Sequence, residues 1–293
     1  MATADTCRED NRLSDLVPSP RSILLFAKAE AREAMRNRWF LLNTAAFVAL
    51  ALGISWLSAM GTGRYGLGGF GRTAAGLVNL VMLIVPLMSL MASAGSLAGE
   101  REKGTLAFLL AQPVTRVELL LGKWLGLALS LLASLALGFG VGGAVLAWKG
   151  GSADAGGFLR LAAASYGLAL ATLSIGFLVS ACCRRQGAAM AWALVLWLLF
   201  ALAGDLVLMG SALALKLEVR TLLGASLANP LQVFKMLAMG GIHASLDLLG
   251  PAGTYAVRSF GAWLVPALVA MLAAWVVVPL AVAAAIFGKR GAA

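Results

Sequence analysis

Apolar residues gather in six long runs along the chain, and short polar segments separate the runs. They cover approximately residues 39–60, 74–98, 119–148, 158–183, 188–210 and 262–287. Each run reaches the roughly 20 residues that a helix needs to cross a hydrocarbon core about 30 Å thick. Lipid offers no hydrogen-bond partner to free backbone groups, so each run must be helical. The pattern predicts an all-α integral membrane protein with six transmembrane helices, of which the third is long enough to contain a bend or a cytoplasmic extension.

The polar segments predict the remaining parts of the molecule. Residues 1–20 are polar and end in Pro-Ser-Pro, which is typical of a loosely ordered tail. Residues 21–38 place apolar positions at helical spacing beside charged ones. They predict an amphipathic elbow helix in the membrane interface, or alternatively a helix packed against a soluble partner. Residues 211–261 are too long for a simple connector. They predict a helical cap on the outer side, with a break at Asn229-Pro230.

Composition supports the membrane assignment, and the distribution of charge predicts the orientation. Of 293 residues, 61% are hydrophobic and only 12% are charged, whereas a soluble domain carries about 25% charged residues. Lys and Arg concentrate before the first span, in the loop 99–118, at Arg184-Arg185 and behind the last span. The positive-inside rule therefore predicts that both termini, including residues 288–293, are cytoplasmic. The same rule accounts for the net charge of +10 without a nucleic-acid partner.

The cysteine count argues against a disulfide framework. The chain has three cysteines, Cys7, Cys182 and Cys183. All three fall at or near the predicted cytoplasmic face, where thiols are kept reduced.

The loop 99–118 is the most informative polar segment. It mixes charges of both signs with a helix-permissive stretch bounded by Gly104 and Pro113. Thr115 and Glu118 have the spacing of a capping box that opens the third span. A short mixed-charge helix here could dock a soluble partner, and an ordinary charged loop would look much the same.

The amino-acid sequence of this loop resembles that of a known family. Residues 99–106 read Gly-Glu-Arg-Glu-Lys-Gly-Thr-Leu, residues 112–118 read Gln-Pro-Val-Thr-Arg-Val-Glu, and residues 121–123 read Leu-Gly-Lys. This is similar to the permease subunits of six-span ABC exporters, and the elbow, the span count and the cytoplasmic termini agree with that family. The resemblance implies a coupling helix that binds a separate ATPase subunit. The coupling residues it implies are Glu100, Arg101, Glu102, Lys103, Gly104, Thr105, Pro113 and Arg116.

A second resemblance lies on the predicted outer side. Residues 229–236, Asn-Pro-Leu-Gln-Val-Phe-Lys-Met, and 246–253, Leu-Asp-Leu-Leu-Gly-Pro-Ala-Gly, resemble the permeases of NosDFY-type transporters. Those transporters serve maturation of the copper sites of nitrous oxide reductase in denitrifying bacteria. The resemblance implies a homodimer in the bacterial inner membrane, two cytoplasmic ATPase subunits, a periplasmic accessory protein, and a copper ion or a sulfur compound as cargo. The partner-facing cap residues would be Asn229, Pro230, Leu231, Val233 and Phe234.

Candidate metal ligands are few. Met236, Met239 and His243 recur at i, i+3 and i+7, and thioethers with an imidazole suit Cu(I). However, Gly240-Gly241 interrupts the run, and methionines at helical spacing usually pack against neighbours. Ordinary packing is therefore the favoured interpretation, with copper ligation as the alternative.

The sequence contains no phosphate-binding loop of the form G-x-x-x-x-G-K-[ST]. ATP and Mg²⁺ would therefore bind the partner ATPase, and this chain is expected to be neither an enzyme nor the holder of a cofactor. A proton-coupled secondary transporter would need buried carboxylates, and Asp205 alone lies inside a predicted span, near its outer end. A generic exporter of a lipid or a small toxic molecule remains an alternative.

Overall fold

The computed structural model describes residues 20–60, 69–111, 114–148, 155–213, 224, 226–240 and 261–290, and helix dominates all of the longer segments. The helices are α2 Pro20–Arg36, α3 Arg38–Met60, α4 Gly69–Glu102, α5 Thr105–Leu110, α6 Arg116–Trp148, α7 Ala155–Cys182, α8 Gln186–Leu213, α10 Pro230–Gly240, the 3₁₀ turn η4 Gly261–Trp263, and α12 Leu264–Arg290. No strand occurs in these segments.

Within the described residues, six helices are long and apolar enough to cross a membrane, namely α3, α4, α6, α7, α8 and α12. This confirms the predicted span count and the all-α class. The third predicted span forms one helix of 33 residues, about 50 Å long at 1.5 Å per residue, so it extends beyond a 30 Å hydrocarbon core.

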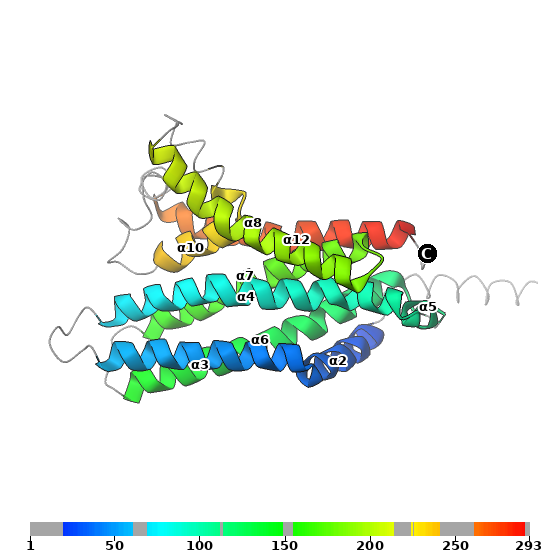
Figure 1. The fold of residues 1–293 in the computed structure, drawn as a ribbon, viewed down its shortest axis with the longest axis horizontal. Coiled ribbons are helices and arrows are strands. Elements are labelled where there is room, and N and C mark those ends of the chain that lie inside the picture. Colours follow the sequence, from blue (N-terminus) through cyan, green and yellow to red (C-terminus); the bar gives the residue numbers. More distant parts are fainter. Residues whose placement is uncertain are drawn as a thin grey trace, which may run out of the picture.

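The long helices form an elongated bundle with two distinct ends (Figure 1). The elbow α2, the short helix α5 and the C-terminal part of α12 lie at one end, here called the α5 end. Helix α10 lies toward the opposite end, here called the α10 end.

The elbow helix is present, as the pattern predicted. Ala27 and Ala34 are buried, and α2 packs chiefly on α6. On other faces, Leu24, Leu25 and Met35 are exposed. An apolar face open to the surroundings favours a position at the membrane interface, which stays a prediction.

Helices α4 and α7 share the most extensive contact in the bundle. An added Cβ at Gly176 of α7 would lie 2.9 Å from the Leu90 carbonyl oxygen and would overlap the Ser93 hydroxyl. The absence of a side chain there lets the two backbones approach, as is typical of helix pairs in membranes.

Hydroxyl groups join α4 to α7 on either side of this contact. Ser89 and Thr172 share a hydrogen bond of 2.6 Å, and the Ser180 hydroxyl donates to the Ala94 carbonyl at 2.8 Å. These bonds fix the register of the two helices in a setting where water cannot replace them.

Helix α10 begins where the sequence predicted a break. The Asn229 side-chain oxygen accepts from the Leu231 amide at 3.0 Å, and its amide nitrogen donates to the Phe200 carbonyl at 2.7 Å. Pro230 occupies the first helical position, where a missing N–H costs nothing. Of the predicted cap before this break, residues 211–213 end α8, and residues 214–223 lie outside the described residues.

The packing of α10 bears on its predicted partner-facing role. Leu231, Val233 and Phe234 are buried in the main core, and α10 packs on α7 and α12. Asn229 and Pro230 are buried as well. Between residues 229 and 239, Lys235 and Leu237 are partly exposed and all the others are buried. The side chains that the sequence assigned to an outer face therefore lie inside this chain, because the bundle encloses α10 on nearly all sides, and the partner-facing role stays a prediction.

Candidate functional site

A sharp turn at the α5 end separates α5 from α4. Gly104 has φ of 75°, a left-handed conformation that only glycine adopts without strain. The Thr105 hydroxyl donates to the Glu100 carbonyl at 3.2 Å and closes the turn. The predicted mixed-charge helix is thus divided: residues 100–102 form the last turn of α4, and α5 itself is apolar.

Helix α5 has one buried side and one exposed side. Leu106 is 1% exposed and belongs to the main core. Phe108 is 71% exposed, so its ring projects from the tip of the bundle. Sequence inspection did not single out Phe108, because nothing in its neighbours shows which side of so short a helix faces outward.

Glu100 points into the bundle and joins an ionic triad. The Lys123 ammonium group lies 2.5 Å from a Glu30 carboxylate oxygen and 2.7 Å from a Glu100 oxygen. Its side chain is only 5% exposed. Ser96 donates to the other Glu30 oxygen at 2.9 Å. The triad ties α2, α4 and α6 together near the α5 end of the bundle.

The other charged residues of α4's last turn bind the α7–α8 connection. Arg101 donates to the Cys183 carbonyl at 2.6 Å, and the Glu102 carboxylate accepts from the Gln186 amide at 2.8 Å. Gln186 begins α8, so an acidic group here also suits the helix dipole. Glu102 and Lys103 are both exposed, and among the described charges assigned to coupling before Gly104 only Lys103 shows no such bond.

The start of α6 has the structure that the sequence predicted. The Glu118 carboxylate accepts from the Thr115 amide at 2.6 Å, and the Thr115 hydroxyl accepts from the Glu118 amide at 3.2 Å, which confirms the capping box. Arg116 donates to the Gly288 carbonyl at 2.6 Å and so holds the end of α12. Pro113 lies outside the described residues.

A cavity of about 340 Å³ opens beside the ionic triad between α2, α3, α4, α6 and α8. Its polar lining includes Glu30, Glu33, Asn37, Asn43, Glu100, Lys103, Lys123 and Gln186, and its thioethers come from Met88, Met91 and Met190. Carboxylates and thioethers thus line one space that reaches from the α5 end into the bundle.

The predicted metal ligands on α10 are only partly described. Met236 and Met239 are buried in the main core, the packing role that the sequence favoured. His243 lies outside the described residues. Among the residues that the structure describes, no cluster of three or more His, Cys, Asp or Glu side chains could hold a metal ion.

Six apolar helices, an amphipathic helix ahead of them and a charged cluster at one end are typical of a multi-pass membrane permease. The sequence model of the family described as "ABC-2 family transporter protein" matches residues 24–292, and the chain belongs to that family. It is a multi-pass protein of the inner membrane, and ATP hydrolysis belongs to a separate subunit.

Two bacterial permeases are similar to this chain over most of its length. The chain is 33% identical over 273 residues to the "Probable ABC transporter permease protein NosY" of Stutzerimonas stutzeri. It is 30% identical over 272 residues to the protein of the same name from Pseudomonas aeruginosa. Each match covers 90% of this chain and 97% of the relative. The chain is therefore a NosY-like ABC permease.

Proposed function

We propose that the α5 end faces the cytoplasm and that α5 docks in a groove of a separate ATPase subunit. The observation that carries this is the exposed Phe108, held outside the spans on a helix that Leu106 anchors. Exposed aromatic side chains of this kind supply much of the binding energy at protein interfaces. Lys103 and Thr105, which are also exposed, would form the polar rim.

The contacts behind α5 support a path for transmitting motion. Movement of α5 acts on the last turn of α4, where Glu100 holds α2 and α6 through Lys123. Arg101 holds the end of α7. Closure of two ATPase subunits would in this way move the elbow and the spans together. ATP and Mg²⁺ would be bound by the ATPases.

The wider role we propose is support of copper-site assembly in nitrous oxide reductase, by moving a copper or sulfur species across the inner membrane. Both relatives carry the NosY name over nearly their whole length. Met88, Met91 and Met190 line one cavity, and thioethers are soft ligands that suit Cu(I). The assembly would contain two copies of this chain, two ATPases and a periplasmic accessory protein.

Replacement of Phe108 by alanine tests both proposals. We expect the ATPase that co-purifies with the permease to fall by about tenfold or more, because loss of an interface anchor costs about 2 kcal/mol or more. Reductase produced in the same cells should then lack its copper. Quantitative blotting of the purified complex and metal analysis of the reductase give the two readouts.

Phe108→Tyr is the matched control, since it keeps the ring and its exposed position. It should retain both the ATPase and the reductase copper. Undiminished co-purification with Phe108→Ala would contradict the docking role. Full copper loading of the reductase despite loss of the ATPase would contradict the maturation role and favour export of another molecule.

The orientation is tested by cysteine labelling in a background without Cys7, Cys182 and Cys183. Cysteines placed at Ala111 and Gln186 should react with a membrane-impermeant maleimide only after the cells are opened. A cysteine at His243 should react in sealed cells. Labelling at Gln186 from outside would overturn the proposed orientation.

A further inference from the structure

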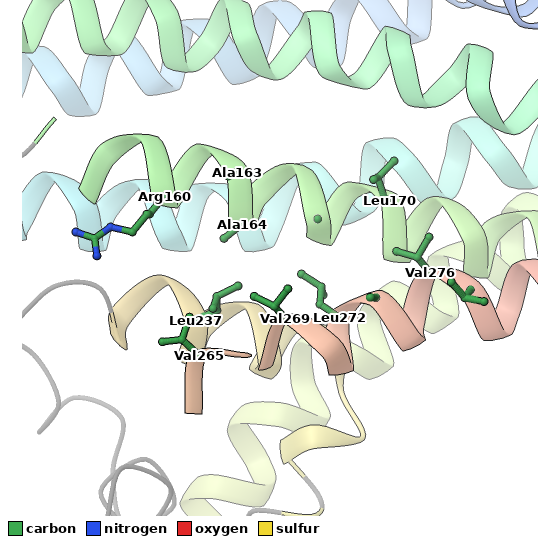
Figure 2. Close-up of a pocket in the computed structure, with 12 residues that line it drawn as sticks. Arg160, Ala163, Ala164, Leu170, Leu237, Val265, Val269, Leu272 and Val276 are labelled. Carbon is green, nitrogen blue, oxygen red and sulfur yellow. The ribbon is translucent and has the colours of Figure 1, made fainter. Parts of the chain in front are cut away.

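The outer surface of the bundle toward the α10 end contains a groove that the coupling site does not use. It encloses about 590 Å³ between α7, α10 and α12. Its lining is Arg160, Ala163, Ala164, Gly167 and Leu170 of α7, Leu237 of α10, and Val265, Val269, Leu272, Ala273, Val276 and Val277 of α12. Figure 2 shows the α7 side chains facing those of α10 and α12 across the space.

The groove has the length of one bilayer leaflet. Its α7 wall runs from Arg160 to Leu170, and its α12 wall from Val265 to Val277. At 1.5 Å per residue these walls measure about 15 and 18 Å. The hydrocarbon core is about 30 Å thick, so the groove spans about half of it.

Small side chains keep the groove open. Ala163, Ala164 and Gly167 form one stripe on α7, at helical spacing. Larger residues at Ala163 and Ala164 would fill the space, whereas Gly167 lets the Leu272 side chain pack directly on α7, since an added Cβ there would lie 2.7 Å from it. Val265, Val269 and Val277 on the opposite wall are at least half exposed. The groove is therefore open to the surroundings along this wall, and its lining is apolar except at one end.

That end carries a positive charge. Arg160 lies within the first two turns of α7, and its Nε donates to the Gly156 carbonyl at 3.2 Å. No carboxylate of the described residues lies within ion-pair distance of its guanidinium group. In Figure 2 its side chain extends beyond the apolar part of the groove. Arg160 lies four residues inside the candidate span that begins at Gly156. A guanidinium group so near the end of a span can reach the interface and bind a phosphate through two N–H groups.

We infer that this groove binds an anionic glycerophospholipid, with one acyl chain along α7 and α12 and the headgroup phosphate on Arg160. The apolar walls match the acyl chain in length and polarity, and the single cation matches the headgroup in charge. The lipid sits in the leaflet at the α10 end, and it links α7, α10 and α12 where their own side chains leave a gap.

Retention of phosphatidylglycerol tests this site. The permease with its ATPase is reconstituted in bilayers of phosphatidylcholine alone or mixed with phosphatidylglycerol, extracted in mild detergent, and analysed by native mass spectrometry. We expect the complex to retain phosphatidylglycerol in preference to phosphatidylcholine. Arg160→Gln should reduce retained phosphatidylglycerol by about tenfold, the effect of losing one or two charge-assisted hydrogen bonds.

Ala163→Phe tests the acyl-chain part of the site, because a ring at this exposed position occupies the groove while Arg160 remains. It should lower retention of phosphatidylglycerol as strongly as Arg160→Gln. Arg38→Gln and Ala133→Phe are the matched controls, at an exposed arginine of the opposite end and an exposed alanine of α6. Both should bind lipid as the unchanged protein does.

Four outcomes would overturn the inference. Equal retention of the two lipids would show that the site does not recognise an anionic headgroup. Unchanged retention in Arg160→Gln would show the same. Unchanged retention in Ala163→Phe would show that no acyl chain occupies the groove. A change of oligomeric state in Ala163→Phe, with retention unchanged, would assign the groove to contact with a second copy of this chain.

Discussion

Replacing Lys123 with methionine should strongly destabilise the permease while leaving its insertion intact. The Lys123 side chain is almost fully buried and is held by Glu30 and Glu100 from two other helices. Without it, two largely buried carboxylates face each other with no counter-charge. Loss of one member of a buried ionic group costs about 3–5 kcal/mol, a large part of the 5–15 kcal/mol by which proteins are usually stable. The melting temperature of the purified permease measures this loss.

The controls for this prediction separate charge from packing. Lys103→Met removes an exposed lysine at the same end and should leave the melting temperature nearly unchanged. The triple variant Glu30→Gln, Glu100→Gln, Lys123→Met removes all three charges and should regain much of the loss, because neutral groups tolerate burial better than an unpaired charge. If Lys123→Met melts like the unchanged protein, the triad does not hold the α5 end together.

The second large effect is expected at Gly176, where α4 and α7 touch. Gly176→Leu should prevent recovery of folded permease, because even the first added carbon lies 2.9 Å from the Leu90 carbonyl oxygen, which belongs to a helix backbone and cannot rotate away. Overpacking costs about 1–3 kcal/mol where side chains can yield, and more where they cannot. The yield of monodisperse protein on size-exclusion chromatography gives the measurement.

Gly140 supplies the matched control, because an added Cβ there meets nothing within 4 Å. Gly140→Leu lies on a span of similar length and should behave like the unchanged protein. Gly176→Ala should fall between the two. Normal yield from Gly176→Leu would show that α4 and α7 do not pack as the structure has them.

These contacts also show how much the sequence could predict. The spans were predictable because lipid imposes one length and one conformation on every crossing segment. The capping box at Thr115 and the start of α10 at Pro230 were predictable because each depends on residues at most three positions apart. Such features do not require knowledge of where the rest of the chain lies.

The direction of the charged side chains at the α5 end was not predictable in this way. Glu100 and Glu102 are two positions apart on one helix, and they bind groups 23 and 84 positions along the chain. Only the assembled bundle shows that Glu100 points inward. The sequence carried one signal that went unused: Lys123 stands between apolar residues at the start of a span, where a charge usually has a specific partner.

Reversing Glu100 and Glu102 together would therefore not isolate a docking surface. The change at Glu100 would place a second cation beside Lys123 and would disturb the bundle itself. The change at Glu102 would remove the acceptor of the Gln186 amide. Phe108 is the better probe, because its side chain is largely exposed.

The elbow's attachment also sets an order of events during synthesis. Glu30 and Lys123 are separated by 93 positions, so α2 leaves the ribosome well before the helix that will hold it. At about 5–20 residues per second, that interval lasts roughly 5–20 s. Throughout it the first two spans can enter the bilayer while α2 has no α6 to pack on, and its exposed leucines can rest at the membrane surface. Arrival of α6 then supplies both the packing surface and the lysine, so a chain truncated before Lys123 should leave its elbow sensitive to protease.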